Sequence, residues 1–166
     1  IGISLFPDDA PDALALVRNA HTALHATKDT GRGTYRFYID EFTRLAQGRQ
    51  ALRRRLHQAL QAGELSLEYQ PQLDAQRQLV GLEALMRWRM DGRMVPPDEF
   101  IPIAEASGLI VPLGRWVFET ACRQAAVWDA AGFVVPVISV NISTIQLREP
   151  QFAQSLLALV HEAGRA

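Results

Sequence analysis

Alternating apolar and polar residues mark the middle of the chain and predict two β-strands. In Leu79–Arg89 (LVGLEALMRWR) the even-numbered side chains are apolar, whereas Glu83 and Arg87 project together from the opposite face. Residues 65–73 alternate in the same way, and the five-residue turn between the two segments predicts a hairpin. On a half-exposed hairpin, Glu83 would form a salt bridge with Arg87 or Arg89. In the alternative interpretation, the charged face lines a site.

Strand and helix patterns alternate in the first 38 residues. Ile1–Phe6 and Tyr35–Tyr38 are typical of short strands. Ala13–Thr30 has the apolar spacing of an amphipathic helix, and Asp12 is a suitable residue to begin it. This β-α-β piece has little apolar surface of its own, so we expect its packing partners to precede the chain's first residue. A second helix is predicted over residues 39–62. The residues expected on the buried face of the first helix are Leu14, Val17, Ala20, Leu24 and Thr27.

The remainder of the chain alternates between helices and a strand, which is the pattern of an α/β fold. The order predicts the start of an α/β barrel or of a doubly wound sheet. An eight-stranded barrel needs about 250 residues, and residues 63–166 supply only 104. The expected elements are a break over Met94–Pro97, a helix from Pro97 to Gly108, a helix from Pro112 to Gly132, a buried parallel strand over Val134–Ser143 and a helix over Gln151–Ala163.

Composition is that of an ordinary globular protein, because 48% of the 166 residues are hydrophobic and the net charge is −1. Near-neutral charge gives no general attraction to nucleic acid or to an acidic membrane. No apolar run approaches the roughly 20 residues that cross a bilayer, so no membrane contact is expected from this segment. Cys122 is the only cysteine, which excludes an intrachain disulfide and favours a reducing, cytoplasmic location.

Polar residues also follow one face of the predicted strand Val134–Ser143. Ser139, Asn141 and Ser143 share that face, opposite apolar neighbours. A buried asparagine needs a hydrogen-bond partner or a ligand, because an unpaired buried amide costs about 1–3 kcal/mol. Asn141 could bond to loop backbone. Together with Glu83 it also offers the oxygen donors that hard divalent cations prefer, and both interpretations stay open from the residues alone.

Five motifs occur in a fixed order between residues 69 and 143. They are YQPQLD (Tyr69–Asp74), GLEALMRW (Gly81–Trp88), VPPDEFIPIAEASGLI (Val95–Ile110), LGRWV (Leu113–Val117) and SVNIS (Ser139–Ser143). Together they closely resemble the N-terminal part of an EAL domain, the cyclic di-GMP phosphodiesterase family. The resemblance runs from about Leu65 to Leu147 and implies the beginning of a TIM-like (β/α) barrel.

The resemblance also implies roles for individual residues. Glu83 and Asn141 would be ligands of a catalytic Mg²⁺ or Mn²⁺ ion. Arg87 would hold a phosphate of cyclic di-GMP, for which a planar, two-pronged cation is well suited. Leu85 would pack against the nucleotide, and Gln70 would face the same pocket. The pair Thr144–Ile145 departs from the Ala-Arg common in the family, which puts only a peripheral contact in doubt.

Residues at the start of the chain resemble a second family. Ile1-Gly2-Ile3, Asn19-Ala20, Lys28, Gly31-Arg32 and Tyr35–Tyr38 match the C-terminal end of a GGDEF domain, the diguanylate cyclase fold. In that family a lysine and an arginine at the positions of Lys28 and Arg32 help to hold nucleotide phosphates. His21 and His25 depart from the family's usual Asp and Tyr. The alternative is that Lys28 and Arg32 only complement the negative end of a helix.

The two resemblances divide the chain into three parts: a GGDEF tail (1–38), a linking helix (39–62) and the N-terminal portion of an EAL domain (63–166). They imply a protein of cyclic di-GMP signalling whose EAL domain hydrolyses cyclic di-GMP to linear pGpG. The remaining metal ligands would follow Ala166, so the 166 residues alone are expected to be inactive. Alternatives are a non-catalytic cyclic di-GMP receptor, or a dimerising module that associates through the amphipathic helix; a homodimer is expected.

Overall fold

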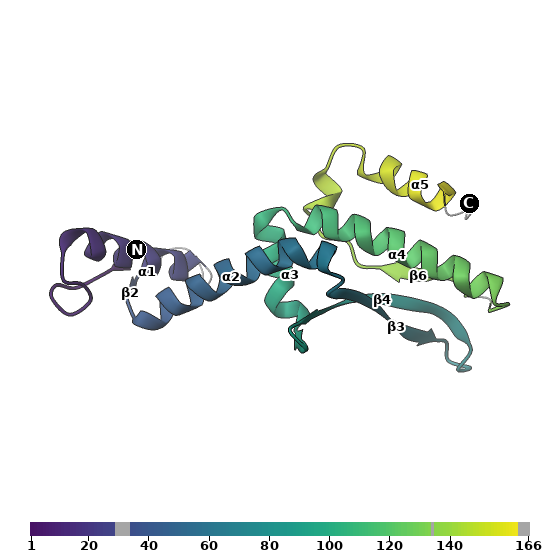
Figure 1. Ribbon diagram of the computed structural model, residues 1–166, viewed down its shortest axis with the longest axis horizontal. Helices are drawn as coiled ribbons and strands as arrows, with labels where there is room; N and C mark the ends of the chain where they lie inside the picture. The colour runs from purple at the N-terminus through teal and green to yellow at the C-terminus, as the bar shows by residue number, and fades with distance from the viewer. Residues whose placement is uncertain (29–33, 134, 163–166) are drawn as a thin grey trace. The chain divides into compact units, whose positions relative to one another are not determined.

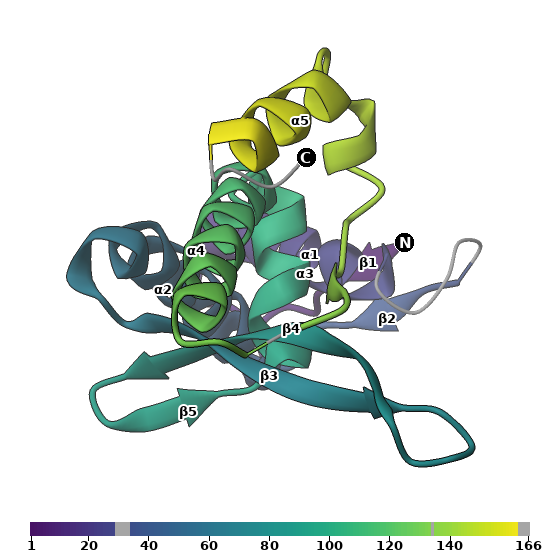
Figure 2. The same ribbon diagram turned by 90° about the vertical axis from the view of Figure 1, so that its right-hand side faces the viewer.

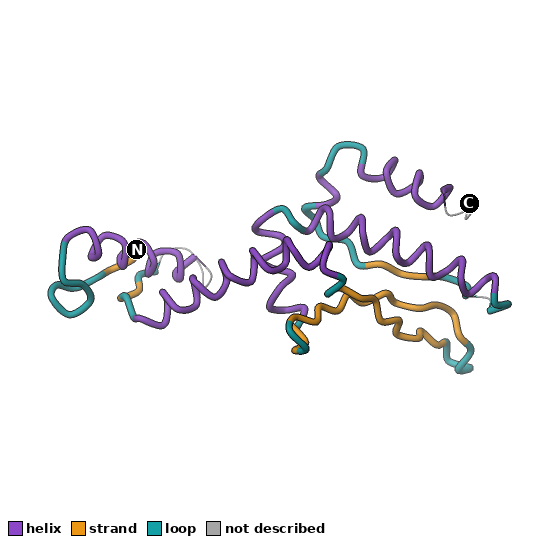
Figure 3. The backbone as a smooth tube through the Cα atoms, viewed as in Figure 1, coloured by secondary structure: helices purple, strands orange, loops and turns teal. Residues whose placement is uncertain are grey.

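A computed structural model describes residues 1–28, 34–133 and 135–162 of the chain, without the side chains of Lys28 and Glu162. These residues belong to two compact units, Ile1–Leu52 and Arg53–Ala166. The division falls within a long helix, α2 (Asp40–Ala62), whose bounds agree with the predicted helix 39–62 to within one residue. Figure 1 labels the elements, and Figure 3 separates helices, strands and loops along the backbone.

The unit Ile1–Leu52 contains a β-α-β arrangement, as predicted, although its strands are shorter than expected. Strand β1 (Gly2–Ile3) pairs in parallel with β2 (Arg36–Phe37), and α1 (Ala13–Lys28) connects them. Asp12 begins α1 by accepting a hydrogen bond at its Oδ1 from the Ala15 backbone N–H, 2.8 Å away. Gly2 is required beside the helix, because a Cβ there would collide with the α1 backbone.

The buried face of α1 agrees only in part with the predicted one, because Thr27 is buried as expected and Ala20 and Leu24 are half-buried. Asn19, Ala23 and Thr27 are its buried positions, whereas Leu14 and Val17 are exposed. Small and polar residues occupy the buried face because the helix backbone comes close to β1 at Gly2, which leaves no room for larger side chains. The Asn19 side chain is satisfied there, since its Nδ2 donates to the Asp9 carbonyl oxygen at 2.7 Å.

The unit Arg53–Ala166 is built on a sheet with β4 (Leu79–Met90) at its centre. Strand β3 (Leu65–Leu73) pairs with β4 along nearly its whole length in the predicted antiparallel hairpin. On the opposite edge of β4, β6 (Ile138–Val140) pairs in parallel with Leu82–Ala84, and β5 (Arg93–Val95) pairs with Trp88–Met90. Figure 2 shows the hairpin extending below the helices.

Two sequence predictions for this sheet need correction. The break predicted over Met94–Pro97 is partly strand β5, because Asp91 (φ 50°) and Gly92 (φ 80°) form a tight left-handed turn that folds the chain back on β4. Of the strand predicted over Val134–Ser143, Val134 lies outside the described residues, and the described part is strand only over Ile138–Val140, which is half-buried. Among the described residues β6 pairs only with β4. The other edge of β6 therefore lacks the neighbouring strand that would bury it.

Helices cover one face of the sheet. They are α3 (Pro97–Ser107) and α4 (Ile110–Ala130), whereas α5 (Phe152–Glu162), which follows the short 3-10 helix η1 (Gln146–Arg148), packs on α4. Gly108 ends α3 with a left-handed φ of 75°. The apolar face of β4 buries Leu82, Ala84 and Trp88, as its alternation predicts. Trp88 meets Phe100 of α3 edge to face at 5.7 Å.

No single helix in the described ranges is both long and apolar enough to cross a membrane. Taken together, α3 and α4 have sufficient length and apolar composition, but the chain bends by 120° between them.

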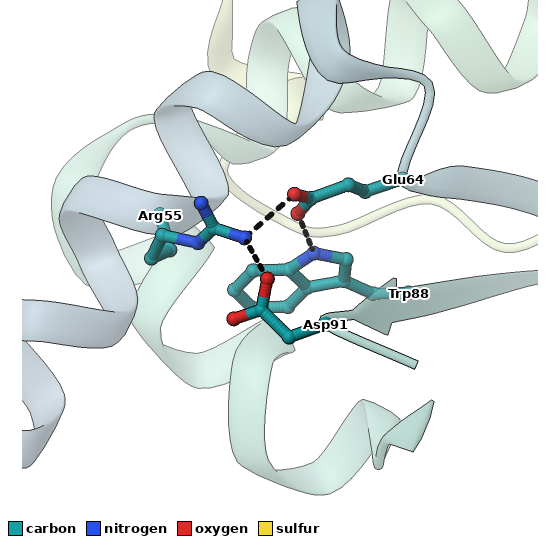
Figure 4. Close-up of polar contacts among 4 residues, drawn as sticks. All are labelled: Arg55, Glu64, Trp88 and Asp91. Carbon is teal, nitrogen blue, oxygen red and sulfur yellow. Dashed lines mark hydrogen bonds and ion pairs between the residues drawn. The ribbon is translucent and has the colours of Figure 1, made fainter. Parts of the chain in front are cut away.

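A polar network ties the last turns of α2 to the end of β4 (Figure 4). Arg55 Nη2 lies 2.7 Å from Glu64 Oε1 and 3.1 Å from Asp91 Oδ1. The second oxygen of Glu64 accepts a hydrogen bond from the indole N–H of Trp88 at 3.0 Å. Because the Trp88 side chain is fully buried, this bond satisfies a donor that water does not reach.

Candidate functional site

The sheet register brings polar residues into one row. Gln70 on β3 lies opposite Glu83 on β4, and Glu83 lies opposite Ser139 on β6. Residues directly opposite one another project from the same face of a sheet. Asn141, just after β6, joins the row, since its Nδ2 donates a hydrogen bond to Glu83 Oε1 at 2.7 Å. Two residues 58 positions apart in sequence thus meet at the edge of β4.

The alternative of a salt bridge from Glu83 to Arg87 or Arg89 is not what the structure contains. Four residues along a strand span about 13 Å, too far for a carboxylate and a guanidinium on the same strand to meet easily. Glu83 accepts from Asn141 instead, and Arg87 pairs with Glu68 of the neighbouring strand. The charged face of the hairpin is therefore organised across strands.

A pocket of about 270 Å³ opens on the edge of β4 between β6 and β5. Because β6 pairs with β4 only as far as Ala84 and β5 pairs with β4 only from Trp88 onward, neither strand covers residues 85–87 of β4. Leu85, Arg87 and Asn141 line the pocket, and α3 and α4 supply half of its remaining wall. Glu83 borders it through the bond to Asn141, whereas Gln70 lies one strand farther away.

Glu68 and the Met86 backbone hold the guanidinium of Arg87. Its Nε lies 2.7 Å from Glu68 Oε2, and its Nη1 donates to the Met86 carbonyl oxygen at 3.2 Å. The Arg87 side chain is 23% exposed and that of Glu68 is 61% exposed. Arg87 is thus a partly buried cation at the pocket wall whose counter-ion faces solvent.

The loop after β6 is fastened by buried polar groups. Ser143 Oγ donates to Glu105 Oε1 on α3 at 2.6 Å, and the Ser143 backbone N–H donates to Gln146 Oε1 at 3.0 Å. Gln146 is only 2% exposed, and its amide fills the space where a Cβ on Gly114 would lie. These contacts fix the loop that carries Asn141. They also satisfy polar groups whose burial would otherwise destabilise the fold.

Sequence reasoning did not single out Glu68, Glu105 or Gln146. Glu105 lies in the motif Val95–Ile110, and Ser143 lies on the predicted polar face of its strand. The sequence therefore draws attention to both segments, but it does not indicate that the two side chains meet. The partner of Arg87 depends on strand register, which alternation alone does not specify. Lys28 is the last residue of α1, but its side chain and all of Arg32 lie outside the described residues.

Tyr69 lies on the face of β3 opposite to Gln70. Its ring meets Trp128 of α4 edge to face at 4.8 Å, and its buried hydroxyl has no hydrogen-bond partner among the described residues. Burial raises the pKa of Tyr69 above its ordinary value, and proximity to Cys122 raises that pKa further. Tyr69 is therefore part of the packing between sheet and helix rather than of the pocket.

Glu83 and Asn141 fit a hard divalent cation in donor type, because each offers an oxygen and the two side chains already touch. The Asn141 amide presents Nδ2 to Glu83, so coordination would use its other atom, Oδ1. Within the described ranges no group of three or more His, Cys, Asp or Glu side chains could hold a metal. Alone, the two residues could supply only part of a set of metal ligands.

Comparison with known proteins identifies the family. The sequence model of the EAL domain matches residues 53–166. The chain belongs to the EAL domain family. It is 44% identical over 165 residues to an uncharacterized signaling protein of Caulobacter vibrioides, which covers 98% of this chain and 19% of that protein. It is 37% identical over 158 residues to the bifunctional diguanylate cyclase/cyclic di-GMP phosphodiesterase MucR of Pseudomonas aeruginosa, covering 94% of this chain and 23% of MucR.

A solved EAL structure, the PaMucR phosphodiesterase in complex with c-di-GMP, superposes with a TM-score of 0.65 at 35% identity. The match covers 69% of this chain and 47% of that one. The chain thus has an α/β fold with EAL-domain neighbours, and it spans about a fifth to a quarter of the length of the two curated relatives. The family match begins inside α2, ten residues before the predicted boundary at residue 63.

Proposed function

We propose that the protein containing this chain is a metal-dependent phosphodiesterase that hydrolyses cyclic di-GMP to linear pGpG at its EAL domain. The observation that carries the proposal is the direct bond between Glu83 and Asn141 beside the pocket that Leu85 and Arg87 line. Relatives named as cyclic di-GMP enzymes, and a related domain in complex with that nucleotide, support the choice of substrate.

Each pocket residue has a role in this proposal. Arg87 binds a phosphate of cyclic di-GMP, because a guanidinium can present two parallel N–H donors to phosphate oxygens. Leu85 offers an apolar surface against which the nucleotide packs. Gln70, opposite Glu83 in the register, contacts the substrate from β3. Asn141 and Glu83 hold Mg²⁺ or Mn²⁺ through oxygen atoms.

A divalent cation in such a site supplies a water of lowered pKa and withdraws charge from the phosphodiester. The residues of this chain contribute binding and orientation. Arg87 fixes the phosphate at the pocket wall, and the Ser143 contacts with Glu105 and Gln146 keep the Asn141 loop beside β4. Glu83 and Asn141 would hold the cation through their oxygen atoms, and the contacts of Ser143 keep Asn141 in place beside Glu83.

The decisive experiment measures pGpG formation from cyclic di-GMP by the purified protein that contains this chain, with Mg²⁺ or Mn²⁺ present. We expect Glu83→Gln to lower kcat roughly 100-fold or more, because the amide is a weaker cation ligand than the carboxylate. Glu99→Gln is the matched control, since Glu99 pairs with Arg93 at 3.4 Å and does not line the pocket. Turnover that survives Glu83→Gln would overturn the proposal.

Tight binding without turnover would favour the alternative, a cyclic di-GMP receptor. Calorimetry with the same two variants separates the cases. A receptor binds cyclic di-GMP but produces no pGpG when Mg²⁺ or Mn²⁺ is present.

We also propose that residues 1–38 are the tail of a GGDEF domain and that residues 39–62 link it to the EAL domain as a homodimerising helix. The β-α-β arrangement of β1, α1 and β2 supports the first part, and the exposed Leu14 and Val17 of α1 suit packing against further elements. Lys28 and Arg32 are its proposed phosphate contacts. A monomer in light scattering at high protein concentration would contradict the homodimer.

A further inference from the structure

We infer that Glu68 is the counter-ion that a phosphate of the ligand must displace from Arg87, and that it thereby sets the pocket's affinity for phosphodiesters. The inference rests on the proposed role of Arg87 in binding cyclic di-GMP. The observation behind it is the 2.7 Å contact between Arg87 Nε and Glu68 Oε2 at the rim of the pocket.

The register explains why these two side chains meet. Ser66 lies opposite Arg87, and Glu68 lies opposite Leu85, so Glu68 is the diagonal neighbour of Arg87 on the same face. Diagonal neighbours on antiparallel strands are within reach of long side chains. Arg87 lines the pocket whereas Glu68 does not. The cation thus stands between an occupant of the pocket and a carboxylate outside it.

Glu68 is suited to be exchanged. Its side chain is 61% exposed, so water takes over its solvation when the pair opens. An exposed ion pair contributes little to stability, which makes its loss inexpensive for the fold. In contrast, Arg87 is mostly buried and keeps its bond to the Met86 carbonyl oxygen, so the guanidinium stays at the pocket wall while its counter-ion changes.

The balance of charges around the pocket explains how Glu68 would lower its affinity for a phosphodiester. Glu68 is the carboxylate in contact with Arg87, whereas Glu83 and Glu105 lie elsewhere around the pocket and accept hydrogen bonds from Asn141 and Ser143. A divalent cation held by Glu83 would offset that carboxylate, and Glu105 is engaged by the Ser143 hydroxyl. Glu68 remains as the charge that cancels Arg87 and repels a phosphodiester anion at close range.

The test is a double-mutant cycle on the protein that contains this chain. Cyclic di-GMP binding is measured by calorimetry in EDTA, which prevents metal-dependent turnover, for the native protein, Glu68→Gln, Arg87→Ala and the double variant. We expect Glu68→Gln to bind about three- to tenfold more tightly, with the gain shrinking as salt is raised. The gain must vanish in the Arg87→Ala background, because Glu68 acts through Arg87.

Glu119→Gln is the matched control. Glu119 pairs with Arg115 at 2.8 Å on α4 and does not line the pocket, so the same change of charge should leave binding unaltered. Equal thermal midpoints of the native protein and Glu68→Gln would show that both are equally folded.

The binding results test the counter-ion role of Glu68 independently of whether the protein hydrolyses cyclic di-GMP. Equal or weaker binding by Glu68→Gln overturns the counter-ion role, even if the native protein hydrolyses cyclic di-GMP. A gain that persists in the Arg87→Ala background overturns it as well. Tighter binding by Glu68→Gln, or binding detected only in that variant, supports the counter-ion even if turnover is absent. Binding by none of the variants overturns both the counter-ion and the proposed role of Arg87 in binding the nucleotide.

Discussion

Two arginine–glutamate pairs lie beside β4, and each has a nitrogen–oxygen distance of 2.7 Å. They differ in how far the carboxylate is exposed to solvent. Near Met90, Arg55 meets Glu64, whose side chain is 17% exposed and whose second oxygen accepts the indole N–H of the buried Trp88 (Figure 4). At the pocket, Arg87 meets Glu68, whose side chain is mostly in solvent. The first pair is part of the packing, whereas the second lies at a surface where a ligand can replace one partner.

The difference shows that distance alone does not define what an ion pair does. A carboxylate that also satisfies a buried donor cannot be removed without leaving that donor unpaired, which costs about 1–3 kcal/mol. Removing the exposed carboxylate of Glu68 leaves no buried donor unpaired, because Arg87 keeps its bond to the Met86 carbonyl oxygen, and exposed pairs contribute about 0.2–1 kcal/mol. Glu64→Ala and Glu68→Ala test this contrast directly, and Gly114→Ala and then Tyr69→Phe test other buried polar groups of the same unit, with smaller effects expected.

Glu64→Ala should lower the free energy of unfolding by about 2–4 kcal/mol, because it leaves the Trp88 N–H and the Arg55 guanidinium without their shared acceptor. Urea unfolding followed by tryptophan fluorescence measures the loss in the unit that holds all three tryptophans, Trp88, Trp116 and Trp128. Glu68→Ala should change the same quantity by less than about 1 kcal/mol. Equal losses in the two variants would contradict the contrast.

Gly114→Ala should destabilise the fold by about 1–3 kcal/mol, because the new Cβ would occupy the space of the buried Gln146 amide. Displacing Gln146 also releases Ser143, so turnover of cyclic di-GMP should fall with stability. The control is Gly48→Ala in α2, where nothing lies within 4 Å of an added Cβ. That change should stabilise its helix by up to about 1 kcal/mol. Thermal unfolding followed by circular dichroism distinguishes the two signs.

Tyr69→Phe should have the smallest effect and only at alkaline pH. The folded state raises the pKa of Tyr69, so the folded protein holds this proton more tightly than the unfolded chain does. That contribution to stability is complete below the ordinary pKa of 10.0 and is lost as pH rises through and above it. The native protein should therefore lose more stability between pH 9 and pH 11 than Tyr69→Phe does, measured by urea unfolding at each pH. An identical pH dependence of the two would contradict the shift.

Alternation predicts much of the sheet and of the pocket because it reports directly on which face a side chain takes. The strand Leu65–Leu73 matches the predicted bounds, and Leu79–Met90 extends the prediction by one residue. The same pattern places Glu83, Leu85 and Arg87 on one face, where the register also puts Gln70. The roles of these residues stay predictions until the variants are measured.

Other features depend on contacts that local pattern does not contain. Strand β5 has only three residues, and its signal was the Asp91-Gly92 dipeptide, a common hairpin turn, rather than any alternation. The buried face of α1 is decided by the close approach at Gly2, which overrides the apolar spacing of Leu14 and Val17. The partner of Arg87 follows from cross-strand register, which becomes known only when β3 and β4 are aligned.

The adjacency of Arg87 and Trp88 on β4 makes the hairpin intolerant of insertions. Because successive side chains on a strand point to opposite faces, a shift by one residue would turn the indole toward the pocket and the guanidinium into the core. Such a variant would lose its core before any change in ligand preference could be selected. The length of this hairpin is therefore constrained by folding, and evolution is left to adjust the pocket by exchanging side chains such as Glu68.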